Sequence, residues 1–227
     1  FGVFDFAGDA LQAVCDELAQ HPPLVLLPAG DVEHRLWMVP SRQAGLITEI
    51  LQNVNVYIAD GHHRYETALT YAQEQGRPGP WDHVFACLCN IASPGLEILP
   101  YHRLVTSPAP HPWADILQRA AQWFTIRKVE SINALQQDNT PSSYLLQLPE
   151  GLWLLTLKDA HVGQCDPLFK NIGAYILDTF FLRKAMGLTD ADLSGGGHLA
   201  YTPFADQAAD ALGKGHAQAA LLLKAVD

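Results

Sequence analysis

Lysine and arginine are scarce in this sequence. The 227 residues include 14 of them against 24 aspartate and glutamate residues, which gives a formal net charge of -10. A surface that binds duplex DNA needs many clustered lysine and arginine side chains, and the sequence contains no such run. We therefore do not expect the protein to bind nucleic acid.

Long hydrophobic runs are also missing. No apolar stretch reaches the about 18 residues of a membrane-spanning helix, and no signal-peptide pattern is present. Among the four cysteines, Cys87 and Cys89 form a single Cys-x-Cys pair without a second pair nearby. Free cysteines are commonly buried, so we expect core packing rather than metal binding. These absences predict a soluble protein of the reducing cytoplasm that contacts no membrane.

The stretch from Val56 to Leu69 carries the clearest local pattern. Val56 to Ile58 favour a short strand, and Asp60-Gly61 is a turn signal. Apolar residues then follow at the spacing of one helical face: Tyr65, Ala68, Leu69 and Ala72. The pattern predicts a strand, a tight turn and a helix that ends at Gly76 and Pro78.

Four groups that carry charge or protons gather where this helix begins: Asp60, His62, His63 and Arg64. Free backbone N–H groups and the positive end of the helix dipole favour an anion there. Uncompensated positive charge at this end costs about 0.3–1 kcal/mol, which argues for a bound anion. The alternative is structural. Asp60 would cap the helix, Gly61 would be needed only for its backbone angles, and the His-His-Arg run would be a solvated first turn.

A family resemblance rests on the run YIADGHHRYETAL and, some thirty residues later, LEILPYHRLV. These runs closely resemble the bacterial and archaeal family called domain of unknown function ten-fifteen, most specifically over about residues 34–106. Gly61, His63 and Arg64 also match the Gly-x-His-Arg turn of the ParB and sulfiredoxin superfamily, which includes nucleotide-dependent free-serine kinases. Members of the resembled family are longer at both ends, so we expect this chain, which begins at Phe1, to be an excised fragment.

The resemblance implies a ParB/sulfiredoxin-like fold and a nucleotide ligand. Sulfiredoxin chemistry needs a cysteine within the turn, and His62 stands at that place. Because the turn has a histidine in place of that cysteine, we do not expect thiol chemistry here. A similarity to ParB does not argue for DNA binding in a chain of this charge.

A second His-Arg pair, His102-Arg103, follows Pro100-Tyr101. Apolar residues on both sides favour burial, so we expect these side chains to emerge at the edge of a cleft shared with His63 and Arg64. His34, at the return corner of a hairpin around Gly30-Asp31, is a further candidate. A lone histidine on a hairpin is more often structural.

The order of the predicted elements indicates an α/β protein of mixed α+β type with two lobes. Residues 1–106 would form the ParB/sulfiredoxin-like lobe that binds phosphate or nucleotide, with a strand over residues 83–90. The proline-rich run 107–112 is typical of a linker. Residues 113–227 would form a smaller α+β accessory lobe with a strong helix over residues 172–186.

Other chemistries fit the sequence less well. No His-x-x-x-His spacing is present, and adjacent histidines diverge by about 100° on a helix, so we expect no metal site made by the protein alone. A serine hydrolase of the Gly-x-Ser-x-Gly type lacks its motif. The loop Gly195-Gly196-Gly197-His198 could cradle phosphate, but it lacks the Lys-Ser/Thr ending of a P-loop, and a plain flexible loop explains it better. Asp178, Asp190 and Asp192 are interpreted as helix-surface or capping residues.

We interpret the protein as one that binds a small-molecule phosphate or a nucleotide, with a phosphotransferase as the enzyme hypothesis. ADP, ATP or CTP would be the nucleotide, and Mg²⁺ would arrive with its phosphates. Gly61, His63, Arg64, His102 and Arg103 would bind the cofactor. The catalytic set would be Asp60, His62, His63 and Glu66, for charge stabilisation, Mg²⁺ binding or proton removal. The alternative is a nucleotide-sensing switch or partner-binding module without turnover.

Overall fold

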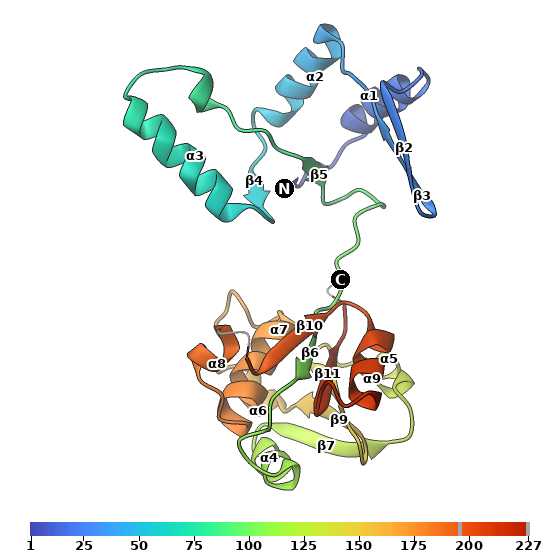
Figure 1. Cartoon of the computed structure of the whole chain (residues 1–227), viewed down its shortest axis with the longest axis vertical. Coiled ribbons are helices and arrows are strands. Elements are labelled where there is room, and N and C mark those ends of the chain that lie inside the picture. Colours follow the sequence, from blue (N-terminus) through green and yellow to red (C-terminus); the bar gives the residue numbers. More distant parts are fainter. Residues whose placement is uncertain (195–196, 226–227) are drawn as a thin grey trace. The chain divides into compact units, whose positions relative to one another are not determined.

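The computed structural model describes residues 1–194 and 197–225 as a mixed α/β protein with three sheets (Figure 1). The chain divides into two compact units, which we call unit 1 (Phe1–Glu97) and unit 2 (Ile98–Asp227). No helix among the described residues is long and apolar enough to span a bilayer.

Unit 1 contains a small sheet with the strand order β4-β1-β5. Strand β1 (Gly2–Phe4) pairs antiparallel with β4 (Val56–Ile58) and parallel with β5 (Leu88–Asn90). We expected a strand over residues 83–90, but only its last three residues pair. Val84 and Phe85 instead lie exposed on the segment that leads into β5. The three strands are therefore too short to form a large core.

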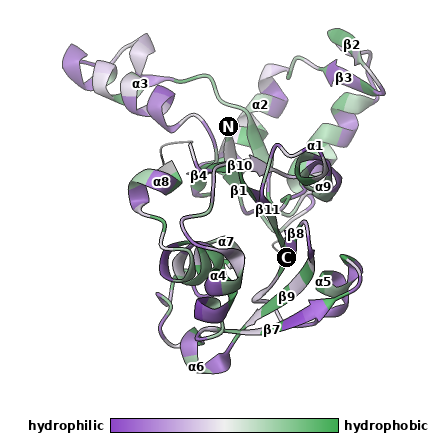
Figure 2. Ribbon diagram, turned by 60° about the horizontal axis from the view of Figure 1, so that its bottom comes forward, coloured by the Kyte–Doolittle hydropathy of each residue, from purple (hydrophilic) through white to green (hydrophobic). Residues whose placement is uncertain are grey.

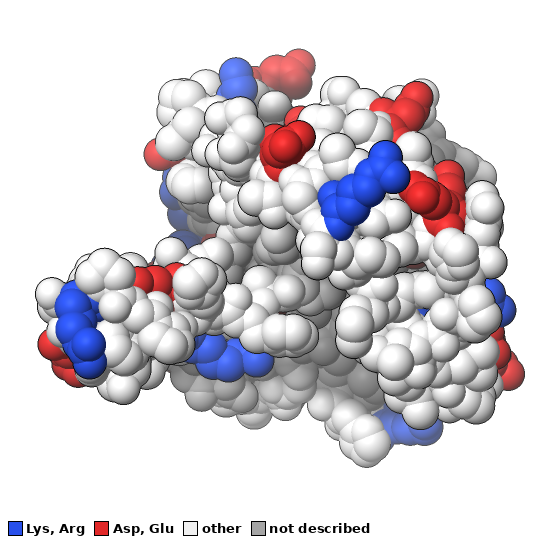
Figure 3. Space-filling view, turned by 90° about the horizontal axis from the view of Figure 1, so that it is seen from above, with Lys and Arg blue, Asp and Glu red and all other residues white. Residues whose placement is uncertain are grey.

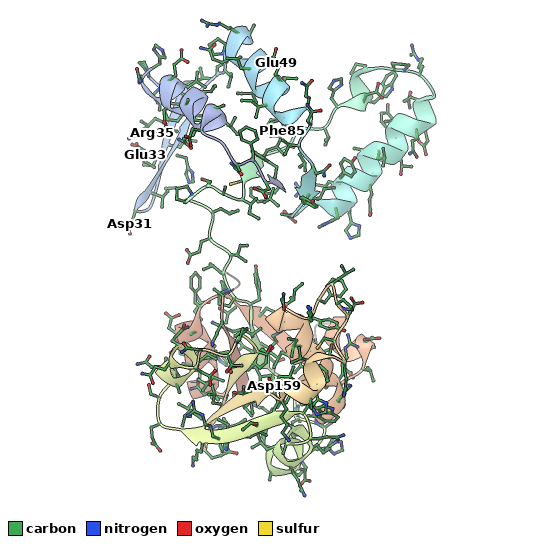
Figure 4. The ribbon with its side chains drawn as sticks, turned by 180° about the vertical axis from the view of Figure 1, so that it is seen from behind. Asp31, Glu33, Arg35, Glu49, Phe85 and Asp159 are labelled. Atoms are coloured by element: carbon green, nitrogen blue, oxygen red, sulfur yellow. The ribbon has the colours of Figure 1, made fainter. Side chains whose placement is uncertain are left out.

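The remaining elements of unit 1 are three helices, a hairpin and a short 3-10 helix. They are α1 (Ala10–Ala19), β2 (Val25–Ala29), β3 (Val32–Leu36), α2 (Ser41–Leu51), α3 (His62–Gln75) and η1 (Pro80–Asp82). The predicted hairpin is confirmed, and Figure 4 labels Arg35 and Glu33, whose side chains form an exposed ion pair on β3. Within unit 1, Phe4 and Val14 are the only hydrophobic side chains that are buried.

Unit 2 is built on an antiparallel sheet with the strand order β10-β6-β11-β8-β9-β7. The strands are β6 (His102–Val105), β7 (Phe124–Val129), β8 (Ser143–Leu148), β9 (Gly151–Leu157), β10 (Leu199–Thr202) and β11 (Ala219–Leu223). Residues 102–105 were expected in the first lobe, before a linker at 107–112. The division between the units falls earlier, after Glu97, so β6 belongs to the sheet of unit 2.

Helices pack on both faces of this sheet. One face meets α4 (Trp113–Ala120), α7 (Gly173–Ile176) and the π-helical segment η2 (Leu177–Ala185), whereas the other meets α5 (Asn133–Gln137) and α9 (Ala205–Gly213). Successive strand residues point to opposite faces, so Leu145 and Leu154 join one core and Leu146 and Leu155 the other. Burial on both faces explains why these strands are continuously apolar.

The predicted helix over residues 172–186 is present as α7 followed by η2. Two short helices complete unit 2, α6 (Asp159–Val162) and α8 (Asp190–Ser194). Helix α8 lies just before residues 195 and 196, which the structure does not describe. The glycine-rich loop over residues 195–198 includes Gly195 and Gly196 and therefore lies partly outside the described residues.

Candidate functional site

The turn between β4 and α3 has the predicted strand, turn and helix. Gly61 precedes α3 with φ of 85°, a left-handed conformation that glycine adopts without steric cost. The N–H of Tyr65 donates to the carbonyl of Gly61 at 3.0 Å, the bond that begins the helix. The backbone N–H groups of the first turn, at His62 to Arg64, therefore have no partner in the preceding helical turn and point out of the helix end. Gly76 ends the helix in the same left-handed region, as predicted.

The side chains of this turn are open to solvent. Arg64 donates through Nη2 to Oδ2 of Asp60 at 3.4 Å, and the two side chains are 80% and 77% exposed. His63 Nδ1 lies 3.4 Å from Oε2 of Glu66, again between exposed groups. Exposed pairs of this kind contribute about 0–1 kcal/mol, so an anionic ligand can replace the carboxylate on Arg64 at little cost. His62 is exposed beside them.

Two hollows meet at Arg64. The smaller one, of about 280 Å³, is lined by residues 60–64 alone. A mainly apolar one of about 450 Å³ shares Asp60, Gly61 and Arg64 with the first. Its apolar lining comes from the sheet, α3 and the segment before β5: Phe1, Gly2, Val56, Ile58, Tyr65, Val84, Phe85, Ala86 and Leu88. A charged end and an apolar end thus adjoin within unit 1.

The apolar hollow was missed by sequence reasoning. Val84 and Phe85 fitted a strand and were assigned to the sheet, although only residues 88–90 pair there. Phe85, labelled in Figure 4, is fully exposed. Exposed apolar patches rimmed by polar residues mark ligand-binding grooves, and Phe85 forms such a patch with the exposed Val84 and Leu88. The sequence offered no signal for this, because the run reads equally well as a buried strand.

His102 and Arg103 lie in β6 and are buried, with 4% and 6% of their surface exposed. We expected them at the edge of a cleft, but their partners lie inside unit 2. Arg103 donates from Nε and Nη2 to the two carboxylate oxygens of Asp178 at 3.2 and 3.1 Å, and His102 Nδ1 accepts the N–H of Leu223 at 3.2 Å. Burial, and then the charge of Arg103, lowers the pKa of His102. Their assignment to the anion site remains a prediction from the sequence alone.

The remaining candidates are more isolated. His34 lies exposed on β3. In the hairpin register it is opposite Leu27, two pairs away from the hairpin's own turn at Gly30-Asp31. Within residues 1–194 and 197–225, no group of three or more histidine, cysteine, aspartate or glutamate residues is placed to hold a metal ion. On the face seen in Figure 3, the lysine and arginine side chains that the structure describes do not form one continuous basic surface. In Figure 2, α3 is drawn mainly in hydrophilic colours, in keeping with its exposed sides.

Comparisons with known proteins place this arrangement in context. A family model with the description "Protein of unknown function (DUF1015)" matches residues 1–176. A search of curated proteins found no match. Among solved structures, a conserved hypothetical protein from Pyrococcus furiosus is similar with 12% identity and a TM-score of 0.40, covering 98% of this chain and 75% of that chain. A free serine kinase in complex with AMP is similar with 12% identity and a TM-score of 0.39, covering 98% and 72%.

Proposed function

We propose that this chain, which belongs to the DUF1015 family of proteins of unknown function, binds a nucleotide through unit 1. The phosphates would lie at the turn from Gly61 to Arg64, and the nucleoside would enter the adjoining apolar hollow. The observation that carries the proposal is that these two hollows share Asp60, Gly61 and Arg64. A nucleotide has the matching division into a charged part and a flat apolar part.

The phosphate end is supported by the local electrostatics. The free N–H groups of the first turn of α3 and the helix dipole both favour a negative group at this position. Arg64 can add two parallel charge-assisted hydrogen bonds, because its present partner Asp60 is an exposed carboxylate. His62 and His63 are close enough along the chain to contribute further donors at the same end.

The nucleoside end is supported by the lining of the larger hollow. Small-molecule sites are concave and mostly apolar, with a few polar groups that orient the ligand. Phe85 and Tyr65 offer aromatic faces, and Val56 and Leu88 offer aliphatic walls. The volume of about 450 Å³ lies within the range of about 300–1,000 Å³ that is usual for small-molecule pockets.

The enzyme hypothesis within this proposal is a phosphotransferase. Asp60 or Glu66 would bind Mg²⁺ with the phosphates or take the proton of the acceptor hydroxyl, and His62 or His63 would stabilise the transferred charge. The resemblance of the turn to a superfamily that includes free-serine kinases makes free serine the first acceptor to test. The ParB/sulfiredoxin-like fold of unit 1 is part of the same proposal.

The first prediction tests the binding site. Replacing Arg64 by alanine should weaken binding of ADP, ATP or CTP at least about tenfold, equivalent to roughly 1.4 kcal/mol, while the melting temperature stays nearly unchanged. Arg42→Ala is the matched control, because Arg42 is also an exposed arginine in the first turn of a helix, α2, without a glycine turn before it. Calorimetric titration of the three nucleotides into each protein, with Mg²⁺ present, measures the difference.

Two results would remove parts of the proposal. Equal affinities for the wild type and the Arg64→Ala variant would remove Arg64 from the site. If the wild type binds none of the three nucleotides, a nucleotide is ruled out as the ligand of this site. If binding is found, turnover of ADP or ATP with free serine separates a phosphotransferase from a nucleotide-sensing switch, since only the first consumes the nucleotide.

A further inference from the structure

Strand pairing in unit 2 brings a serine and a histidine together outside the site described above. Ser107 follows the end of β6, and His198 precedes the start of β10, its antiparallel partner. The register continues past both strands, because the N–H of Thr106 donates to the carbonyl of His198 at 3.0 Å. At this position the Ser107 hydroxyl forms a hydrogen bond with Nδ1 of His198.

A carboxylate holds the other side of the same imidazole ring. Oδ1 of Asp192, on α8, lies 3.3 Å from Nε2 of His198. The other oxygen, Oδ2, accepts hydrogen bonds from the backbone N–H of Thr189 at 2.8 Å and from its hydroxyl at 2.7 Å. These bonds from Thr189 lower the pKa of Asp192 and orient its carboxylate. The result is a chain of acid, imidazole and hydroxyl.

The direction of these hydrogen bonds determines what the serine can do. When Nε2 carries the proton that faces Asp192, Nδ1 has a free lone pair and can accept the proton of the Ser107 hydroxyl. This is the logic of the serine–histidine–aspartate triad with the two ring nitrogens exchanged. Triads occur on unrelated folds and in different chain orders, so the missing Gly-x-Ser-x-Gly motif does not exclude one here.

The group is also open to a substrate. The side chains of His198 and Asp192 are 39% and 30% exposed, and Ser107 is half-buried between the exposed Thr106 and Pro108. None of the three takes part in the proposed nucleotide site, which belongs to unit 1. A hydroxyl that is hydrogen-bonded to a base and open to solvent is the arrangement that an activated nucleophile requires.

We propose that Ser107, His198 and Asp192 form a second reactive site, at which the Ser107 hydroxyl attacks small carboxylic esters. Oγ of Ser107 forms a bond to the carbonyl carbon while its proton passes to Nδ1 of His198. The carbon–alkoxide bond of the ester then breaks, and the alcohol leaves with that proton. Water repeats the transfer in reverse, releasing the carboxylic acid and restoring Ser107. Asp192 acts as a positioning residue, since it holds the ring and stabilises its charged form.

The test is covalent labelling of the whole chain with a fluorophosphonate, which reacts with activated serine hydroxyls, followed by peptide mass spectrometry. Ser93 is the internal control, because it is likewise half-buried and followed by a proline, Pro94, but is hydrogen-bonded to no histidine that the structure describes. General-base catalysis contributes about 10²–10⁴-fold, so Ser107 should be labelled at least about 100-fold faster than Ser93. This comparison needs no variant and does not depend on the folding of one.

Variants then separate the three roles. Ser107→Ala should abolish the burst of nitrophenol from p-nitrophenyl acetate, and Ser93→Ala should leave it unchanged. Asp192→Asn should slow labelling of Ser107, and Asp192→Glu should restore part of the rate, which a merely structural role would not do. Equal labelling of Ser107 and Ser93, or a burst that survives Ser107→Ala, would overturn the proposal.

Discussion

At the scale of single residues, Gly61 decides how the chain passes from β4 into α3. Its φ of 85° lies in the left-handed region, and a Cβ at this position would lie 3.1 Å from Nη2 of Arg64. Any side chain here therefore strains the backbone and displaces the guanidinium that we assign to phosphate binding. The same glycine thus determines the turn and leaves room beside it for the guanidinium of Arg64.

The second prediction follows from this geometry. Gly61→Ala should lower the free energy of unfolding by about 1–2 kcal/mol, the usual cost of a left-handed conformation for a residue with a Cβ. It should also weaken nucleotide binding. Gly45→Ala is the control, since Gly45 lies inside α2 with open space around its Cβ position and should gain about 0.5–1 kcal/mol. Urea denaturation of both variants measures the difference, and a stabilised Gly61→Ala protein would contradict the structure of the turn.

The third prediction concerns the ion pair between Arg103 and Asp178. The arginine side chain is 7% exposed and the aspartate 32%, so removal of the carboxylate leaves a buried positive charge. Breaking a fully buried pair costs about 3–5 kcal/mol, and we expect roughly 2–3 kcal/mol for Asp178→Asn because water screens the partly exposed Asp178. Asp210→Asn breaks the exposed pair with Lys214 and should cost about 0–1 kcal/mol. Similar losses in both variants, measured by chemical denaturation, would show that burial does not strengthen the first pair.

His102 gives the fourth prediction, a dependence of stability on pH. Burial lowers its pKa below the unfolded value of 6.5, and protonation would break the hydrogen bond that Nδ1 accepts from Leu223. Below pH 6.5 the unfolded chain therefore binds more protons at this residue than the folded chain does. Its contribution to stability is complete above pH 6.5 and is lost as the pH falls from 6.5 toward the folded pKa. Denaturation midpoints between pH 7.5 and 5 should fall less steeply in His102→Gln than in the wild type.

At the scale of elements, the hairpin β2–β3 and the sheet of unit 2 are both rich in leucine but differ in what covers them. All residues of the hairpin are exposed, including Leu26 and Leu27. Leu154 and Leu155 in β9 are fully buried because helices pack on both faces of the sheet. Sequence periodicity alone does not separate the two cases, since both contain consecutive apolar residues.

The fifth prediction compares one substitution in these two elements. Leu155→Ala should cost about 2–5 kcal/mol, because it leaves a cavity in a packed core. Leu27→Ala should change the free energy of unfolding by less than about 0.5 kcal/mol, since its side chain is 59% exposed. Chemical denaturation of the two variants measures this contrast. A large loss from Leu27→Ala would mean that the hairpin is covered in solution.

At the scale of the whole molecule, the two units differ in how they are stabilised. Unit 2 has two cores, one on each face of a six-stranded sheet, whereas unit 1 buries only Phe4 and Val14 among its hydrophobic residues. Local stability follows buried apolar contacts, so unit 1 is expected to open at a lower free energy than unit 2. The proposed nucleotide site lies in the unit that has less of its stability from packing, and a bound ligand would stabilise that unit.

The sequence by itself determined the local elements around the candidate site. The β-forming residues 56–58, the glycine at 61 and the spacing of Tyr65, Ala68 and Leu69 predict the strand, the turn and α3, because these features depend on backbone preference and periodicity within a few residues. The hairpin around Gly30 and the helix beginning near residue 172 were predicted for the same reason.

Only the tertiary structure decided which distant residues meet. Arg103 was predicted at an anion site, yet its two carboxylate contacts come from Asp178, 75 positions along the chain. Ser107, Asp192 and His198 had no shared motif and come together because β6 and β10 pair in one register and α8 lies beside them. Pairing between distant strands depends on the burial of whole faces rather than on local preference, which is why sequence spacing does not reveal these contacts.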